Sequence, residues 1–191
     1  MIESYSSDGE FCVGVVADTH IPDRERALHP ALLEVLRAKQ VQLILHAGDI
    51  SIPRVLTELT TVAPVLAVKG NRDFTFGAQL PLSRELVVNG QRVLLTHGHM
   101  GAFTYWVDKF QHLASGYQAA RYITRLTQAA PEAAVYIFGH SHCAEEIHQD
   151  GKLFFNPGSA CFALPPEKRR SCGLLYFSAA GVRSQIVYLD E

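Results

Sequence analysis

Short apolar runs alternate with amphipathic stretches over the first third of the chain. Residues 11–17, 41–47 and 64–68 are mostly apolar and rich in β-branched or aliphatic side chains, which predicts strands that are buried on both faces. The two intervening stretches, 27–39 and 53–60, carry apolar residues at helical spacing. This alternation of strand and helix predicts a parallel sheet with both faces covered.

The pattern changes after residue 71. Residues 84–88 and 91–96 flank Asn89-Gly90, which predicts a two-residue hairpin because both turn residues accept positive φ. Residues 103–128 have helical periodicity and predict one long helix, or two if Gly116 is a break. Further strands are expected over 133–138, 145–149, 152–155, 173–178 and 182–189. The whole pattern predicts an α/β fold, a four-layer α-β-β-α sandwich of two mixed β-sheets flanked by helices.

Length and composition fit one globular domain. With 191 residues, 48% of them hydrophobic, the chain can bury a sizeable core, and we expect a single domain over residues 1–191. A formal net charge of -2 argues against broad electrostatic attraction to nucleic acid or a membrane. No apolar run approaches the ~18 residues of a membrane span. The four cysteines form no C-x-x-C pair, which favours buried free thiols and a cytoplasmic protein.

Five short clusters of metal-binding residue types stand out from this background. Four of them directly follow an apolar run, and the end of a strand is where a rigid fold can direct a side chain into a shared site. The clusters are Asp18-Thr19-His20, Gly48-Asp49, Gly70-Asn71-Arg72-Asp73, His97-Gly98-His99 and Gly139-His140-Ser141-His142. Their positions predict one convergent centre that binds a pair of metal ions.

The residue types also indicate which chemistry this centre performs. Carboxylate and neutral imidazole ligands suit Mn, Fe, Zn, Ni or Co, and the absence of clustered thiolates argues against a structural zinc site. In each of the pairs Asp18/His20 and His140/His142 the two residues are two positions apart, so both side chains can face one cavity. The carboxylate of Asp49 can bridge two cations at the ~3.5–4 Å spacing of two-metal hydrolases.

In this order, the motifs Asp-x-His, Gly-Asp, Gly-Asn-x-Asp, His-Gly and Gly-His-x-His resemble those of the calcineurin-like metallophosphoesterase superfamily. The spacing and the segment Asn156-Pro157-Gly158-Ser159 resemble its small single-domain branch of phosphodiesterases. The resemblance extends over residues 13–159. It is specific for the superfamily and says little about the substrate.

The resemblance implies a binuclear centre with two divalent ions, for which Mn is expected and Fe, Zn, Ni, Co and Mg are alternatives. The first ion would be held by Asp18, His20, Asp49 and His142, and the second by Asp49, Asn71, His97 and His140. It also implies that a metal-bridging hydroxide attacks phosphorus in line with the leaving alkoxide. The cations would neutralise the non-bridging phosphate oxygens.

Arg72 departs from the pattern, because many members of the superfamily carry a histidine at this position that is thought to protonate the leaving group. Arginine cannot act as a general acid, but its planar fork can bind phosphate oxygens, so Arg72 is interpreted either as a phosphate clamp or as a surface arginine paired with an acid such as Asp73. His99 either supplies the missing proton or is a polar neighbour of the ligands. Asn71, Arg72 and His99 are therefore the candidate catalytic residues.

Several residues around the clusters have two interpretations. His46 either supports a ligand by a hydrogen bond or fills the core, and Asp73 either orients the Asn71 loop or is a turn acid. The Asn156–Ser159 turn is expected to border the site, with Ser159 or its backbone amide near the phosphate. Residues 100–131 resemble a helical insertion, whose aromatic residues either line the substrate pocket or pack against the core or a second subunit. These aromatic residues are Phe103, Tyr105 and Trp106.

The resulting functional hypothesis is a metal-dependent phosphoesterase that acts on a small-molecule phosphate ester, with phosphodiesters favoured over phosphomonoesters. A different class is a protein-interaction scaffold that keeps the fold while the metal centre degenerates. The complete set of ligand positions favours an enzyme over a scaffold. A nuclease would need a basic groove that this composition does not indicate, and a homo-oligomer is left open.

Overall fold

The computed structural model describes residues 2–74, 79–99, 116–162 and 169–190. Two mixed β-sheets form its centre. The five-stranded sheet has the order β11-β10-β2-β3-β4, in which β2, β3 and β4 are parallel and β10 is antiparallel to both of its neighbours. Its strands are β2 (Phe11–Val16), β3 (Leu43–His46), β4 (Val65–Ala67), β10 (Ser171–Ser178) and β11 (Gly181–Tyr188).

The second sheet has six strands in the order β1-β5-β6-β7-β9-β8. Within it, β6, β7 and β9 are parallel, whereas β5 and β8 are antiparallel to their neighbours β6 and β9. The strands are β1 (Glu3–Tyr5), β5 (Ser83–Val88), β6 (Gln91–Thr96), β7 (Val135–Ile137), β8 (Ala144–Gln149) and β9 (Lys152–Pro157). The predicted hairpin at Asn89-Gly90 joins β5 to β6, and both turn residues have positive φ.

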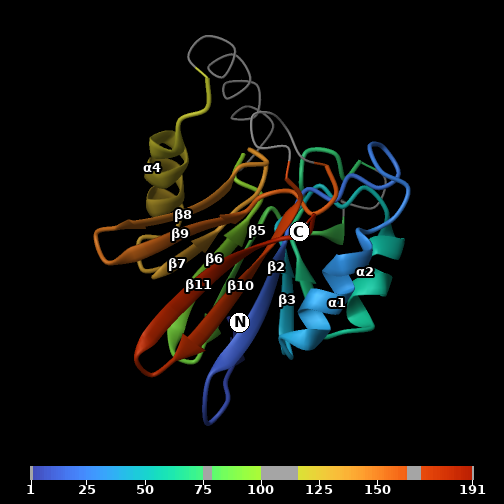
Figure 1. The fold of residues 1–191 in the computed structure, drawn as a ribbon. Helices are drawn as coiled ribbons and strands as arrows, with labels where there is room; N and C mark the ends of the chain where they lie inside the picture. The colour runs from blue at the N-terminus through green and yellow to red at the C-terminus, as the bar shows by residue number, and fades with distance from the viewer. Residues whose placement is uncertain (1, 75–78, 100–115, 163–168, 191) are drawn as a thin grey trace.

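Helices cover the outer faces of the two sheets. Helices α1 (Pro30–Ala38) and α2 (Pro53–Thr60) lie on one side of the sandwich, and α4 (Ala119–Ala129) lies on the other side (Figure 1). Both α1 and α2 begin with a proline, whose fixed φ suits the first turn of a helix. This arrangement confirms the predicted α-β-β-α fold.

The alternation of side chains along the strands explains the three hydrophobic layers. Val13 and Val15 of β2 face the layer between the sheets, whereas Cys12 and Val16 face α1 and α2. In β9, Phe154 packs beneath α4 while its neighbours face the layer between the sheets. Because consecutive side chains of a strand point to opposite faces, only nearly continuous apolar runs can fill two layers at once.

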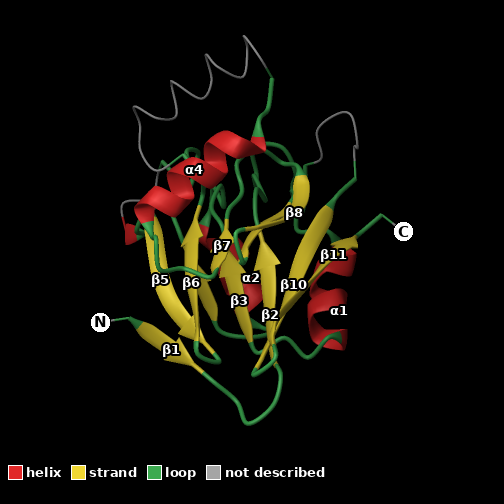
Figure 2. Cartoon of the chain, turned by 90° about the vertical axis from the view of Figure 1, so that its left-hand side faces the viewer, coloured by secondary structure: helices red, strands yellow, loops and turns green. Residues whose placement is uncertain are grey.

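The structure adds one strand to the expected elements, and it describes only part of one expected helix. Strand β1, which pairs parallel with β5 at the edge of the six-stranded sheet, was not predicted because Glu3–Tyr5 is polar and largely exposed (Figure 2). In the expected helical segment 103–128, the described part begins after residue 115, and Gly116 has φ 71° before α4 starts. Phe103, Tyr105 and Trp106 lie outside the described residues.

Within the described residues, no helix is both long and apolar enough to cross a membrane. The carboxyl ends of the parallel strands carry the five clusters identified in the sequence. The loops after β2, β3 and β4 carry the first three clusters, and those after β6 and β7 carry the other two. Loops at the carboxyl ends of parallel strands meet at one edge of a sheet, which is where open α/β folds bind ligands.

Candidate metal centre

The five clusters form one site, in which strained backbone holds most of the predicted ligands. Asp18, His20, Asp49, His140 and His142 all have positive φ, between 50° and 71°. This conformation costs an L-residue roughly 1–2 kcal/mol and concentrates at functional sites. Hydrogen bonds fix it here, since the Asp18 N–H donates to the Gly48 carbonyl and the His20 N–H donates to the Asp49 carbonyl, both at 3.0 Å.

One group of side chains gathers around His20 and His142. Their Nε2 atoms lie 3.1 Å apart, and the two rings are stacked. Asp18 Oδ1 lies 3.7 Å from His20 Nε2 and 3.5 Å from His142 Nε2. Asp18, His20 and His142 therefore present three ligand atoms to a common point, as the first predicted ligand set requires.

A second group gathers around the amide oxygen of Asn71. This Oδ1 atom lies 3.0 Å from His97 Nε2 and 2.8 Å from His140 Nδ1. The two imidazole nitrogens are 3.2 Å from each other. Asn71, His97 and His140 thus converge in the combination expected for the second ion.

Asp49 lies between the two groups. Its Oδ2 atom is 3.6 Å from His20 Nε2, and its Oδ1 atom is 3.5 Å from His97 Nε2. Gly70 allows the neighbouring loop to approach this carboxylate, because a Cβ atom at Gly70 would lie 2.1 Å from Asp49 N and 2.2 Å from Asp49 Oδ1. One oxygen towards each group is the geometry that a bridging carboxylate needs.

The hydrogen bonds of two imidazole rings direct their free ring nitrogens into the site. His97 Nδ1 donates to the Ala47 carbonyl at 2.7 Å, and His142 Nδ1 donates to the Phe162 carbonyl at 3.0 Å. In the neutral rings of His97 and His142, each Nε2 atom then carries a lone pair that points at other hydrogen-bond acceptors. Among the described residues, the buried Asp18 Oδ1 atom has no hydrogen-bond partner. A metal ion satisfies such a set of converging lone pairs, so the donor set fits the implied cations.

The electrostatics of the unliganded side chains support the same conclusion. Burial raises the pKa of Asp18 well above its usual range, with a further contribution from the charge of Asp49, and burial raises the pKa of Asp49 to about 6. Burial lowers the pKa of His20 to about 3 and also lowers the pKa of His97. The histidines are therefore held neutral, as metal ligands must be, while the paired carboxylates need a compensating positive charge.

Asp73 organises the loops that carry the ligands. Its fully buried carboxylate accepts four backbone N–H groups, from Gly70, Ile50 and Ser51 at 2.7–2.8 Å and from Asp49 at 3.2 Å. These bonds tie the loop after β3 to the loop after β4. The structure thus favours the interpretation of Asp73 as a loop-orienting residue. All of its described hydrogen bonds are to backbone N–H groups, and none is to a predicted ligand atom.

His46 supports the same loops from the core. Its Nδ1 atom accepts the N–H of Gly48 at 3.2 Å, which leaves Nε2 as the donor to the Thr19 hydroxyl at 3.4 Å. Burial lowers the pKa of His46 to about 3. His46 therefore acts through the residues that flank Asp49 and Asp18 rather than by a bond to a ligand atom.

The Asn156–Ser159 turn supports the loops that carry the ligands. Ser159 is fully buried, and its hydroxyl donates to the Asp18 carbonyl at 2.7 Å and accepts the N–H of Phe162 at 3.0 Å. Asn156 donates to the Gly139 carbonyl at 3.1 Å. The structure thus does not favour the Ser159 hydroxyl as a phosphate ligand, because this hydroxyl holds two loops together, and the role of the Ser159 backbone amide stays a prediction.

A cavity of about 200 Å³ opens over the ligand groups. Two guanidinium groups line it, those of Arg72 and Arg24. Neither has a carboxylate within ion-pair distance among the described residues. Asp73 is not the partner of Arg72, because backbone N–H groups occupy its carboxylate. The other lining residues are His20, Asp49, Asn71, His140, His142 and Phe162.

His99 is buried next to the second ligand group. Its ring lies 5.3 Å from the His97 ring and 5.8 Å from the His140 ring, measured between centroids. His99 is not among the described residues that line the cavity over the ligands. This placement suits a residue that packs against ligands, and the role of His99 as a proton donor stays a prediction.

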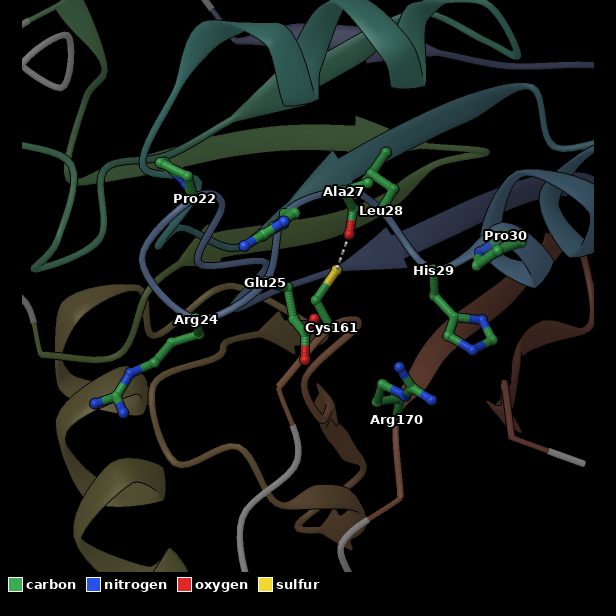
Figure 3. A pocket seen from close by; sticks show the side chains of 10 residues that line it. Pro22, Arg24, Glu25, Ala27, Leu28, His29, Pro30, Cys161 and Arg170 are labelled. Atoms are coloured by element: carbon green, nitrogen blue, oxygen red, sulfur yellow. Dashed lines mark hydrogen bonds between the residues drawn. The ribbon is translucent and has the colours of Figure 1, made fainter.

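A larger cavity, of about 540 Å³, lies beside the site and shares Arg24 with it. Figure 3 shows Glu25, Cys161, His29 and Arg170 around this second cavity, with the side chain of Arg24 directed away from Glu25 and Cys161. Arg170 and His29 both lie close to Asp190, so that part of the wall is already an ion-pair cluster. The converging ligand atoms identify the smaller cavity as the candidate site.

Sequence reasoning missed Arg24 and Phe162. Arg24 is four residues beyond His20 in a loop, and its backbone N–H donates to the His20 carbonyl at 2.8 Å. Phe162 comes from the distant segment after β9. No periodicity marks either residue, and only the first could have been suspected, as a cation close to a ligand motif.

Comparison with known proteins gives a consistent result. The sequence model of the calcineurin-like phosphoesterase superfamily domain matches residues 12–179. A protein named probable metallophosphoesterase from Methanothermobacter thermautotrophicus is 37% identical over 147 residues, which cover 77% of this chain and 76% of the relative.

Solved structures of similar fold come from proteins with different names. Vacuolar protein sorting 29 from Cryptosporidium parvum superposes with a TM-score of 0.74 at 18% identity, over 95% of this chain and 98% of that chain. A structure described as a novel archaeal phosphodiesterase has a TM-score of 0.63 at 19% identity, over 93% of this chain and 100% of the other. At these identities the likeness is one of fold.

Proposed function

Because this chain belongs to the calcineurin-like phosphoesterase superfamily, we propose that it is a phosphoesterase with two divalent cations in its active centre, and that it hydrolyses phosphodiesters. The observation that carries the proposal is the position of Asp49. Its two carboxylate oxygens face two separate groups of ligand atoms, 3.6 Å from His20 Nε2 and 3.5 Å from His97 Nε2.

When bound, two cations supply positive charge to the phosphoryl oxygens and lower the pKa of attacking water. The residues that would hold the first are Asp18, His20, Asp49 and His142, and those for the second are Asp49, Asn71, His97 and His140. Manganese is the expected ion, since this oxygen and nitrogen donor set accepts several metals and availability decides among them.

The chain's own residues perform the binding and positioning. Arg72 lines the cavity and has no carboxylate within ion-pair distance among the described residues, and its backbone N–H donates to Asp49 Oδ1 at 2.7 Å, which fixes the loop beside the bridging carboxylate. A guanidinium in this place binds phosphoryl oxygens and does not transfer a proton. Turnover is therefore expected to favour esters with good leaving groups, such as aryl diesters.

The size of the cavity supports a substrate whose phosphoryl group alone is enclosed. At about 200 Å³ the cavity is smaller than the ~300–1,000 Å³ typical of pockets that enclose a whole small molecule. The alcohol parts of a diester would extend outside it.

A second candidate function is a protein-interaction scaffold, which the fold shared with vacuolar protein sorting 29 brings into consideration. The complete ligand set and the two arginines that line the cavity favour the enzyme. A scaffold would need neither the strained ligand loops nor a cationic cavity.

The test measures bound metal and the hydrolysis of bis(p-nitrophenyl) phosphate after loading with Mn²⁺. We expect two ions per chain and metal-stimulated hydrolysis, with both strongly reduced in Asp49→Asn and unchanged in Asp150→Asn, which alters an exposed turn. A protein that binds two ions but hydrolyses neither diesters nor monoesters with any of several metals would support the scaffold instead.

A further inference from the structure

Arg24 belongs neither to the five sequence clusters nor to the two groups of ligand atoms. Arg24 lies in the loop after His20, and its guanidinium sits over the ring of Phe162, with Cζ 4.8 Å from the ring centroid. A cation above an aromatic face is held by the ring quadrupole, so Phe162 orients this side chain. Both residues line the cavity above the ligands.

Phe162 connects Arg24 to the candidate ligands. Its carbonyl accepts the Nδ1–H of His142 at 3.0 Å, and the ring of His142 meets the ring of Phe162 edge-on, with centroids 6.1 Å apart. Arg24 is also fixed from its own side, because its backbone N–H donates to the His20 carbonyl at 2.8 Å. The backbone bond thus fixes the main chain of Arg24 next to His20, and the contact with Phe162 positions the guanidinium.

The charge of Arg24 has no partner in the described part of the chain. None of its described contacts is with a carboxylate. Arg72, on the loop after β4, lines the same cavity, and among the described residues it too has no carboxylate within ion-pair distance. Two guanidinium groups from different loops that face one small cavity form a site for an anion with several oxygens, because each fork can donate two hydrogen bonds.

We propose that Arg24 and Arg72 form a two-arginine clamp that binds the non-reacting oxygens of a phosphoryl group, with Arg24 as a substrate-positioning residue held by Phe162. The proposal deepens the phosphoesterase function and rests on it for the identity of the anion. Arg24 holds the ester in place and transfers no proton, so its contribution is to binding.

The experiment is calorimetric titration of inorganic phosphate into the protein, both metal-free and loaded with Mn²⁺. We expect Arg24→Ala to raise the Kd about tenfold in each state, as for the loss of one charge-assisted hydrogen-bonding group. Arg24→Lys should raise the Kd by roughly threefold, because the charge remains while the fork is lost. The matched control is Arg26→Ala, an exposed arginine of the same loop that does not line the cavity above the ligands.

Kinetics provide a second measurement on bis(p-nitrophenyl) phosphate. Arg24→Ala should raise KM about tenfold and change kcat less than threefold. If the Arg24→Ala variant does not fold, Arg24→Gln is used in its place in both measurements, because glutamine keeps most of the aliphatic part of the side chain over Phe162.

Equal phosphate affinities of the Arg24 and Arg26 variants would overturn the clamp, as would a wild-type protein that binds no phosphate. Phosphate binding that depends on Arg24 in a protein without hydrolytic activity would keep the clamp and reject the enzyme. The two proposals therefore fail separately.

Discussion

The Nε2 atoms of His20 and His142 face each other at 3.1 Å although the two residues are 122 positions apart in the sequence. His142 Nδ1 is committed to the Phe162 carbonyl, so its Nε2 atom offers a lone pair to the space it shares with His20 and Asp18. Two ring nitrogens and a carboxylate oxygen with this orientation offer three ligand atoms to one cation.

This relationship predicts that the two ions can be removed separately. His142→Ala takes a donor only from the group around Asp18 and His20, whereas His97→Ala takes one only from the group around Asn71. Each variant should bind about one ion per chain where the wild type binds two, as measured by elemental analysis after dialysis. Loss of both ions in each variant would show instead that the positions fill cooperatively.

The lack of a proton donor at Arg72 predicts the effect of restoring one. Arg72→His should raise kcat for an alkyl phosphodiester about tenfold or more relative to an aryl diester, since a positioned general acid typically contributes 10²–10⁴-fold when the leaving group is poor. KM should rise for both substrates because the guanidinium is lost. An unchanged rate on the alkyl diester would mean that leaving-group protonation does not limit turnover.

The four N–H groups on the carboxylate of Asp73 predict a large stability effect. In Asp73→Asn the amide NH₂ faces N–H donors, and at least one buried donor loses its acceptor. The free energy of unfolding should fall by roughly 2–4 kcal/mol, measured by urea denaturation of the metal-free protein. Asp150→Asn, in an exposed turn, is the control and should change it by less than about 0.5 kcal/mol.

His46 predicts a dependence of stability on pH. Its native pKa is about 3 against an ordinary value of 6.5, so between these pH values the unfolded chain binds a proton at this residue and the native chain does not. Its contribution to stability is complete above pH 6.5 and falls by about 1.4 kcal/mol per pH unit between pH 6.5 and pH 3. In metal-free His46→Gln, the slope of the unfolding free energy against pH over this range should be smaller by that amount. An unchanged slope in His46→Gln would contradict this assignment.

Much of this fold was predictable because its strands are buried on both faces. Residues 11–17 and 41–47 are apolar at nearly every position because they fill two layers, and that leaves a clear signal. Strand β1 leaves none, because Glu3–Tyr5 gains its place by pairing with β5 and buries little. Helix α2 was predicted with the bounds Pro53–Thr60 that the structure has, since Pro53 marks its first turn.

The candidate site shows the same division. Asp18, Asp49 and His97 were predictable as metal-binding types at the ends of strands. Arg24 was not, because its place depends on the aromatic ring of Phe162, which follows β9 far along the chain. The loop-holding role of the Ser159 hydroxyl was not predictable for a related reason, because hydrogen bonds to the backbone of another loop leave no pattern in the sequence.

The division of the ligands between the two sheets has a mechanical consequence. Asp18 and Asp49 follow strands of the five-stranded sheet, whereas His97 and His140 follow strands of the six-stranded sheet. Cations shared by these residues would tether the two sheets at one end of the sandwich and leave the Asn89-Gly90 end untouched. Chelation should therefore accelerate amide hydrogen exchange at the ends of β3 and β6 nearest the ligands and not in the hairpin turn. Uniform acceleration would show that the ions stabilise the whole fold rather than only the end of the sandwich that carries the ligands.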